Sequence, residues 1–339
     1  MFVATSVEVF VPASVANLGP GFDAVGMALE IFNVVRMGTA PTGLEITVLG
    51  DDGDQPADRT NLVARSAVAL FEEAGLVVPG LRIHVNQAIP VSRGLGSSAA
   101  AIVAGLVGAN ALAGFPLSKD ALLELAVEIE GHPDNVAAAL FGGFVVSVSD
   151  GNRPPCHLRL DVPGSLHVVV AIPDLHVSTE LARSILPESV TLADAVHNIG
   201  RVALLVGAIA CGRLDFLSAA MSDRLHQPYR ANLVPGLDNV LVAATRAGAL
   251  GAALSGSGPS VVAFARTNPH SVAEAMLEAF GASGVACRTV VTRVCPRGAV
   301  VVEDPEASGE EPLFGGAESC SPTDRCSSDS ARASASRRW

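Results

Sequence analysis

The sequence predicts an α+β fold with two lobes, and three observations point to it. Strand-like and helix-like patterns follow one another along the chain, the mixture occurs in both halves, and a proline-rich stretch, NRPPCHL at 152–158, separates the halves. A chain of 339 residues is long enough for one large domain or two of ordinary size. We therefore expect an N-terminal domain over 1–150, a C-terminal domain over 151–302 and a tail over 303–339.

Each half supplies its own strands and helices. In the first half, β-branched runs predict strands at 5–11, 30–36, 44–49, 81–86 and 142–149. Apolar residues at helical spacing predict helices over 61–74, 97–113 and 118–130. In the second half, the same signals predict strands at 166–172, 251–256, 259–265 and 287–294, and helices over 191–210 and 269–281.

The composition of the chain changes at about residue 303. From there on it is rich in serine, glycine and charged residues. Such a segment has too few apolar side chains to offset the entropy lost on ordering. We expect residues 303–339 to form a disordered tail, and the sequence gives no role for it.

Composition and charge exclude several classes of function. Although 49% of the residues are hydrophobic, no window reaches the roughly 18 uninterrupted apolar residues of a membrane span, and the N-terminus lacks the positive region of a signal peptide. A net charge of −12 argues against a nucleic-acid partner. The six cysteines show neither a C-x-x-C pair nor metal-ligand spacing, which predicts reduced thiols without zinc or disulfides. We expect a cytoplasmic enzyme that binds neither nucleic acid nor membrane.

A glycine- and serine-rich stretch, PVSRGLGSSAAAIVAG at 90–105, precedes one of the predicted helices. It lacks the lysine of a Walker loop, and Lys119 is the only lysine in the chain. Its glycines permit positive φ, Ser97 or Ser98 is expected to cap the helix, and the free amides and dipole at the helix start form an anion site. Arg93 adds a charge. The loop can therefore hold a phosphate without a lysine, although taken alone it also fits a plain turn into a core helix.

Two further glycine-rich segments favour a phosphate-binding loop over a plain turn: VPASVANLGPGFDAVGMAL at 11–29 and GALGAALSGSGPSVVAFA at 248–265. Neither contains G-x-G-x-x-G or G-x-S-x-G, which weakens a dehydrogenase or a serine-hydrolase interpretation. In this order and at these separations, the three segments resemble those of the GHMP kinases, a family of small-molecule kinases, over about residues 5–300. Within the family, the first segment, EGHPDNVAAALFGG at 130–143 and HQPYR at 226–230 resemble the homoserine kinases.

The resemblance implies a two-lobed fold with a ribosomal-protein-S5-like N-terminal half, a ferredoxin-like C-terminal half and an active site between them. It also implies ATP and Mg²⁺ as cofactors. Glu130 matches a family magnesium ligand, although a carboxylate on the last turn of an exposed helix is the alternative, and we expect Ser98 to offer its hydroxyl to the magnesium ion. The implied ATP-binding residues are Asn61, Pro90, Val91, Ser92, Arg93, Gly94, Leu95, Gly96, Ser97, Ser98, Ala99 and Ala100.

The acceptor implied by the resemblance is L-homoserine, whose binding needs acceptors for an ammonium group and arginines for a carboxylate. The family positions that line the amino and hydroxyl side are Asn17, Asp23, His132, Asp134 and Asn135. Arg183 and Arg230 would hold the carboxylate, although either arginine alone also fits a surface salt bridge.

The implied catalytic residues are Glu130, Asn135 and Arg183. Several relatives carry an aspartate where this chain has Asn135, so we expect catalysis by positioning, magnesium and the helix dipole instead of a strong base. The chain also has Ala138 where the family usually has proline, which we expect to alter only the entry to the following helix.

The product would be O-phospho-L-homoserine, for threonine biosynthesis. Two alternatives remain open: a kinase for another small alcohol, and a catalytically silent ATP-binding regulator. The oligomeric state is also open, with a homodimer among the options.

Overall fold

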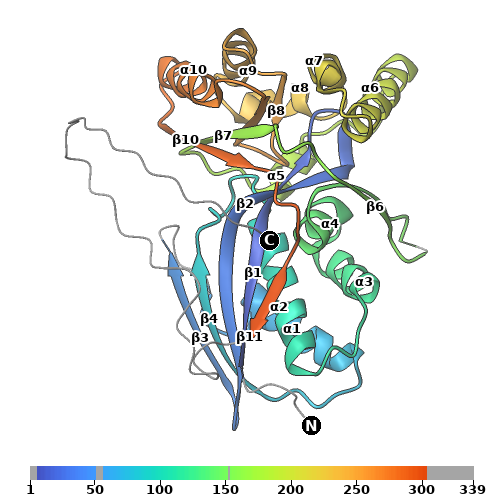
Figure 1. The fold of residues 1–339 in the computed structure, drawn as a ribbon, viewed down its shortest axis with the longest axis vertical. Helices are drawn as coiled ribbons and strands as arrows, with labels where there is room; N and C mark the ends of the chain where they lie inside the picture. Colours follow the sequence, from blue (N-terminus) through green and yellow to red (C-terminus); the bar gives the residue numbers. More distant parts are fainter. Residues whose placement is uncertain (1–5, 51–55, 152, 304–339) are drawn as a thin grey trace, which may run out of the picture. The chain divides into compact units, whose positions relative to one another are not determined.

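The computed structural model describes residues 6–50, 56–151 and 153–303. All of them belong to one compact unit, which contains two β-sheets with helices packed on them (Figure 1). Helices and strands occur in both halves of this unit, which confirms the α+β prediction. Apart from residue 303, the predicted tail lies outside the described residues.

The first sheet has seven strands: β1 Ser6–Asn17, β2 Gly21–Ala40, β3 Leu44–Gly50, β4 Gly80–Gln87, β5 Phe144–Val148, β6 Cys156–Leu160 and β11 Val300–Glu303. Five of them follow the order β11-β1-β2-β4-β3, and β5 joins β2 to β6. All pairs are antiparallel except β3 with β4. Alternation in β4 buries Leu81, Ile83 and Val85 and leaves the residues between them exposed, as its sequence predicts.

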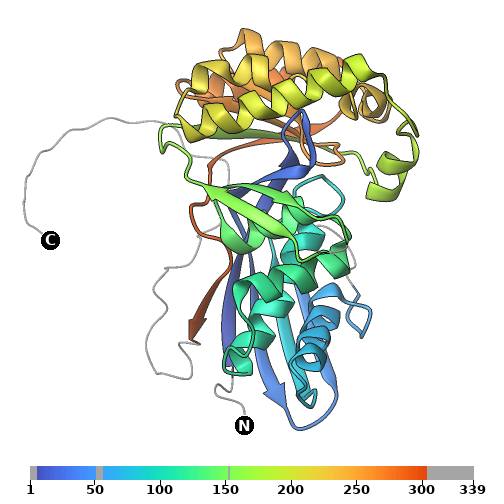
Figure 2. The same cartoon turned by 90° about the vertical axis from the view of Figure 1, so that its right-hand side faces the viewer.

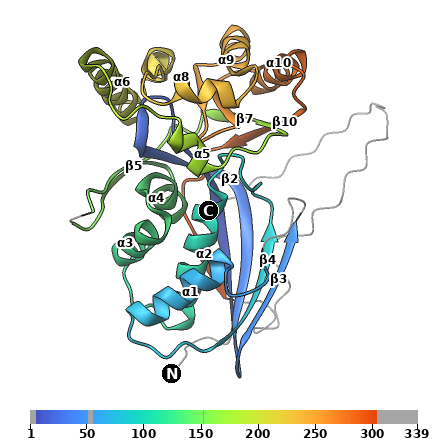
Figure 3. The ribbon, with the colours of Figure 1, turned by 180° about the vertical axis from the view of Figure 1, so that it is seen from behind.

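Four helices cover one face of this sheet: α1 Leu62–Glu73, α2 Ser97–Leu112, α3 Lys119–Glu130 and α4 Pro133–Phe141 (Figure 3). Helix α2 is buried almost all round. It packs closely on α1 because Gly105 has no side chain, and a Cβ there would collide with the carbonyl of Val63. The middle of α2 is thereby held close to α1.

The second sheet has four antiparallel strands in the order β10-β7-β9-β8. They are β7 His167–Pro173, β8 Gly251–Leu254, β9 Val261–Ala265 and β10 Cys287–Arg293. The longer helices of this half are α6 Leu192–Ala210, α9 Leu237–Arg246 and α10 Pro269–Ala282 (Figure 2). Helices α9 and α10 pack on one face of this sheet, with Val169 and Ala171 of β7, whereas the buried apolar residues of α6 belong to the same core as the first sheet. Three short α-helices, α5 Thr179–Ser184, α7 Leu217–Ala220 and α8 Gln227–Arg230, and two 3-10 helices, Leu214–Phe216 and Ala231–Leu233, also belong to this half.

The two sheets are not built from two consecutive stretches of the chain. Strand β6 lies beyond residue 150 but pairs with β5, and β11 returns from the second half to pair with β1. The first sheet therefore contains both ends of the described chain, and the second sheet begins only at β7. The predicted domain boundary at residue 150 stays a prediction.

Helix α6 is, in the described part of the chain, the one helix long and apolar enough to span a membrane by length and composition alone. Its Asn198 is buried and hydrogen-bonds to Asp223 and to the carbonyl of Pro20. A single helix of this kind is weak evidence for a span, because core helices pass the same test.

Candidate active site

The three glycine-rich segments meet at one place. Ser255 Oγ, from the third segment, donates a hydrogen bond of 2.6 Å to the carbonyl of Gly94 in the second. Asn17 Nδ2, from the first, donates one of 2.9 Å to the carbonyl of Gly256 in the third. Residues 161 and 239 positions apart in the sequence are thus held together beside the start of α2.

Glycine is required at two positions of this surface. Gly94 and Gly96 have φ of +73° and +68°, in the left-handed region. A Cβ on Gly94 would collide with the carbonyl of Ser255, and one on Gly96 would collide with Ser14 Oγ. The glycines therefore permit both the turn and the close contact between segments.

The first turn of α2 has no side-chain cap. The expected cap by Ser97 or Ser98 is wrong, because Gly96 occupies the N-cap position. Ser98 Oγ instead donates a 2.6 Å hydrogen bond to Glu130 Oε1. The first-turn amides thus remain for a ligand, and an anion is what the amides and the dipole favour.

Glu130 ends α3, but its side chain is only 10% exposed, so the alternative of a carboxylate at an exposed helix end does not hold. Burial raises its pKa above the ordinary range, and the hydrogen bond from Ser98 opposes this. The described residues contain no group of three or more His, Cys, Asp or Glu side chains suited to a metal ion. Mg²⁺, however, usually takes one or two carboxylates together with phosphates and waters. The paired oxygens of Ser98 and Glu130 fit that requirement.

The start of α4 carries His132, Asp134 and Asn135. His132 Nδ1 lies 2.7 Å from Asp134 Oδ1, and Ser14 Oγ donates a 2.9 Å hydrogen bond to Asn135 Oδ1. Burial lowers the pKa of His132, but the hydrogen bond and the negative charge of Asp134 outweigh it and leave this pKa raised. The expectation for Ala138 was wrong: it lies buried in the middle of α4, not at a helix entry.

Arg183 and Asp23 are paired with each other. Arg183 Nη1 and Nη2 donate hydrogen bonds of 2.9 and 2.7 Å to Asp23 Oδ2 and Oδ1, a bidentate ion pair that links α5 to the first glycine-rich segment. Donating these hydrogen bonds to Asp23 raises the pKa of Arg183 above its already high ordinary value. The two side chains remain 38% and 34% exposed, so the pair is accessible from solvent.

Arg230 is in a different environment, with 2% exposure. Its Nε donates to the carbonyl of Ala182 at 3.1 Å and its Nη1 to that of Gly256 at 3.0 Å. Burial, followed by the charge of Arg183, lowers its pKa to about 10. The interpretation of Arg230 as a surface salt bridge is therefore wrong.

One cavity brings most of the predicted site residues together. Residues from both halves of the unit line it: Asn17, Asp23, Pro90, Val91, Ser92, Arg93, Gly94, Leu95, Gly96, Ser97, Ser98, Glu130, His132, Asp134, Asn135, Arg183 and Arg230. Val177, Thr179, Gly256 and Ser257 also line it and were missed. Ser257 belongs to the third glycine-rich segment, so that segment already contained a signal for it.

Three predicted ATP-binding residues lie outside this cavity. Asn61 caps α1, its Oδ1 accepting from the amide of Val63, and it lines an adjoining cavity with Ala100. That cavity shares Val91, Ser97 and Ser98 with the first and has apolar walls, including Val35, Val48 and Val85. Ala99 is buried and its side chain faces neither cavity.

Arg93 connects the loop to the second sheet. Its Nη2 donates a 3.0 Å hydrogen bond to Asp174 Oδ1, next to the end of β7. Its Nη1 is buried without a hydrogen-bond partner among the described residues. Arg93 thus brings an uncompensated donor to the loop that lines the cavity.

Comparison with known proteins identifies the family to which this chain belongs. A family model described as the GHMP kinases N terminal domain matches residues 61–143, and one described as GHMP kinases C terminal matches 202–284. A curated protein of Moorella thermoacetica is 47% identical over 86% of this chain and 98% of its own length. The chain belongs to the GHMP kinase family, whose members are ATP-dependent small-molecule kinases.

The relatives themselves carry a more specific name. The Moorella thermoacetica protein is named homoserine kinase, as is one from Carboxydothermus hydrogenoformans that is 47% identical over 89% of this chain and 99% of its own length. A solved homoserine kinase from Cytophaga hutchinsonii is 35% identical and superposes with a TM-score of 0.82, covering 89% of this chain and 99% of that one. The two-lobed fold implied by the sequence motifs is thereby confirmed.

Proposed function

We propose that this chain transfers the γ-phosphoryl group of ATP to the side-chain hydroxyl of L-homoserine, giving O-phospho-L-homoserine for threonine biosynthesis. One observation carries the proposal. A single cavity is lined both by the uncapped start of α2 and by Arg183, Arg230 and Asp23. The first set suits phosphates and the second suits an amino-acid zwitterion. The names of the relatives support the same substrate.

ATP would lie across the two adjoining cavities. The apolar walls beside Asn61 suit an adenine ring, and Ser97 and Ser98, which line both cavities, mark the point where they join. The phosphates would then lie against residues 90–98 and accept hydrogen bonds from the first-turn amides of α2. Ala99 would contribute through its backbone only, since its side chain is buried.

Ser98 and Glu130 would hold Mg²⁺, with phosphate oxygens and waters completing its coordination. When bound, the ion would neutralise charge on the β- and γ-phosphates. Glu130 would bind in its ionised form, which the ion's charge favours in spite of burial.

Homoserine binding would exchange one ion pair for two. Asp23 and Arg183 now satisfy each other, and a zwitterion offers each a new partner: its ammonium for Asp23 and its carboxylate for Arg183. Arg230 would bind the same carboxylate from the buried side. The substrate would thus replace the internal pair without leaving a charge unpaired, which favours a zwitterion over an uncharged alcohol.

Positioning would supply most of the catalysis. Asn135 is a neutral amide held by Ser14, so it orients the acceptor and takes no proton. The α2 amides would stabilise charge on the transferred group, Arg183 would contribute by holding the acceptor in place through its carboxylate, and the loose transition state of phosphoryl transfer needs no strong base. Proton loss from the hydroxyl would be assisted by phosphate or solvent.

A coupled assay of ADP release, run over a panel of small alcohols, tests this proposal. We expect turnover with L-homoserine well above the rate with ATP alone. A different best acceptor would favour a kinase for another alcohol, and absence of any acceptor-dependent turnover would favour a silent ATP-binding regulator. A cytoplasmic location, the absence of membrane and nucleic-acid partners, and a homodimer remain predictions from the sequence.

A further inference from the structure

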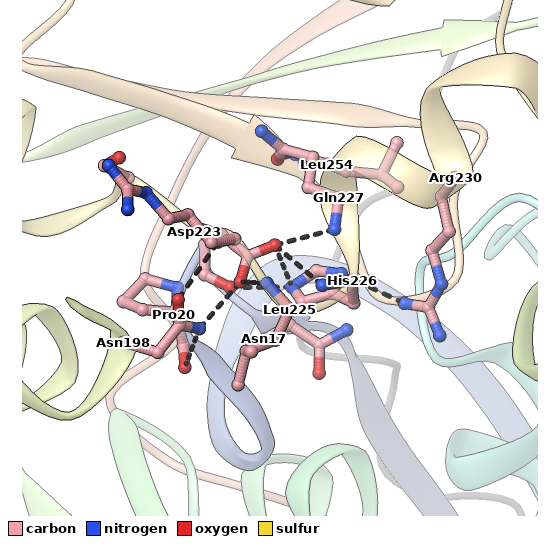
Figure 4. A network of polar contacts seen from close by, with 12 residues as sticks. Asn17, Pro20, Asn198, Asp223, Leu225, His226, Gln227, Arg230 and Leu254 are labelled. Atoms are coloured by element: carbon pink, nitrogen blue, oxygen red, sulfur yellow. Dashed lines mark hydrogen bonds and ion pairs between the residues drawn. The ribbon is translucent and has the colours of Figure 1, made fainter. Parts of the chain in front are cut away.

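His226 lies completely buried at the N-cap of α8, between the first glycine-rich segment and Arg230. Its Nε2 is 2.7 Å from the carbonyl oxygen of Gly19, and its Nδ1 is 3.2 Å from Arg230 Nη1 (Figure 4). The ring also stacks on Phe22, with centroids 5.3 Å apart. This histidine therefore contacts the buried arginine directly, although it does not line the cavity.

The two contacts fix the protonation state of the ring. A carbonyl oxygen only accepts hydrogen bonds, so Nε2 must carry a proton. A guanidinium only donates, so Nδ1 must be unprotonated. Burial lowers the pKa of His226, and the charge of Arg230 adds to this while Asp223 and Asp23 oppose it. Geometry and charge thus agree on the neutral ring with its hydrogen on Nε2.

Asp223 holds this histidine in place. Its carboxylate is buried and accepts hydrogen bonds from the backbone amides of Leu225, His226 and Gln227 and from Asn198 Nδ2 (Figure 4). Asn198 also donates to the carbonyl of Pro20, at 3.3 Å. Helix α6, the first glycine-rich segment and α8 are therefore tied together around the ring, which leaves it little freedom to turn.

The consequence falls on the guanidinium of Arg230. Its Nε and Nη1 are occupied by Ala182, Gly256 and His226, whereas no hydrogen bond among the described residues involves Nη2. Arg230 lines the cavity, so its remaining donor is left for a ligand there. Without the His226 acceptor, Nη1 would keep only the carbonyl of Gly256, so this orientation of the guanidinium would be less strongly favoured.

We infer that His226 is a positioning residue: its unprotonated Nδ1 holds Arg230 so that Nη2 meets the carboxylate of the acceptor. The inference rests on the proposed function, because it takes that carboxylate to be the ligand of Arg230. It assigns a role within HQPYR to a side chain that does not touch the substrate.

A matched pair of variants separates the two ring nitrogens. In His226→Asn the amide oxygen takes the place of Nδ1 and still accepts from Arg230. In His226→Gln the longer amide reaches the place of Nε2 and still donates to Gly19, but leaves Arg230 without its acceptor. His197, half-buried on α6 with its Nε2 3.2 Å from Ser222 Oγ, provides a control in His197→Gln.

We expect His226→Gln to raise the KM for homoserine about ten-fold, as for the loss of one charge-assisted hydrogen bond, with the KM for ATP unchanged. His226→Asn should stay within about three-fold of the parent, and His197→Gln should match it. Equal losses in both His226 variants, or a larger loss in His226→Asn, would overturn the inference, since a merely structural role does not distinguish the two nitrogens.

Proton–nitrogen correlation NMR of the histidine-labelled parent gives a second measurement that does not depend on the variants folding. A neutral ring with its hydrogen on Nε2 supports the inference, and an imidazolium or a hydrogen on Nδ1 rules it out. If the parent shows no homoserine-dependent turnover, the proposed function fails. The NMR result then still decides whether His226 accepts from Arg230.

Discussion

Replacing Arg183 by leucine should separate carboxylate recognition from every other part of the site. Arg183 would bind the homoserine carboxylate through charge-assisted hydrogen bonds worth about 1.5–3 kcal/mol, which corresponds to a rise of roughly ten- to a hundred-fold in the KM for homoserine. Because the side chains of Arg183 and Asp23 are 38% and 34% exposed, losing their pair should reduce stability by less than about 1 kcal/mol. The variant should therefore fold and bind ATP normally.

Arg230 is less suitable for this test. Its replacement by leucine would leave the buried carbonyl of Ala182 and the Nδ1 of His226 without a donor, and the carbonyl of Gly256 with Asn17 alone. Each unsatisfied buried group costs about 1–3 kcal/mol, so a kinetic defect would be mixed with a loss of several kcal/mol in stability. A large fall in Tm for Arg230→Leu, but not for Arg183→Leu, is itself expected.

The assay compares two substrates. Homoserine and the amino alcohol that lacks its carboxylate are each measured with parent and Arg183→Leu enzyme, and ATP binding is measured by calorimetry without acceptor. The amino alcohol should be a poor substrate of the parent. It should be unaffected or improved in the variant, because Asp23 no longer has to leave Arg183 to bind an ammonium group. Lost ATP affinity, or equal losses with both substrates, would refute the reasoning.

Three further predictions follow from single contacts. Glu130→Gln should lower turnover and raise the Mg²⁺ concentration needed for half-maximal rate, and an unchanged Mg²⁺ titration would contradict its role as a ligand. Gly96→Ala should weaken ATP binding more than about ten-fold, because Gly96 has a positive φ and an added Cβ would collide with Ser14. The control is Gly200→Ala, since an added Cβ there meets open space. This variant should bind ATP normally and unfold at the same or a higher temperature. Burial keeps the pKa of His226 below its unfolded value of about 6.5, so the parent should lose stability as pH falls through that value. His226→Asn should lose less stability over the same pH range. Parallel curves of Tm against pH for the two proteins would contradict this.

The sequence predicted elements well where one face is solvated. The alternation of LRIHVN marked β4, and the periodicity of 269–281 marked α10, because each has a buried and an exposed side. The first glycine-rich segment was not recognised as two strands. Residues 11–17 are buried throughout, so no alternation marks this part of β1. The four-residue β11 depends on pairing with β1 at the other end of the described chain, which no local pattern shows.

For the site, the motifs supplied the residues but not their partners. The motifs indicate the loop at 90–98 and assign Ser98 and Glu130 to one metal ion, but not the hydrogen bond between these two side chains. The pair of Arg183 with Asp23 depends on packing between segments more than 150 residues apart. The contact of Arg230 with His226 depends on the orientation of a buried ring. Neither can be seen in a local sequence pattern. Asp223 carries no motif signal at all, because its role is to accept hydrogen bonds from backbone amides beside it.

The most direct test of the central claim identifies the product. Purified full-length chain is incubated with ATP, Mg²⁺ and L-homoserine, and the mixture is followed by phosphorus NMR. We predict that a phosphomonoester resonance coupled to the side-chain methylene protons of homoserine grows in step with ADP, and that it is absent when homoserine is omitted. ADP accompanied only by inorganic phosphate, or no loss of ATP, would contradict the assignment of this cavity to homoserine phosphorylation.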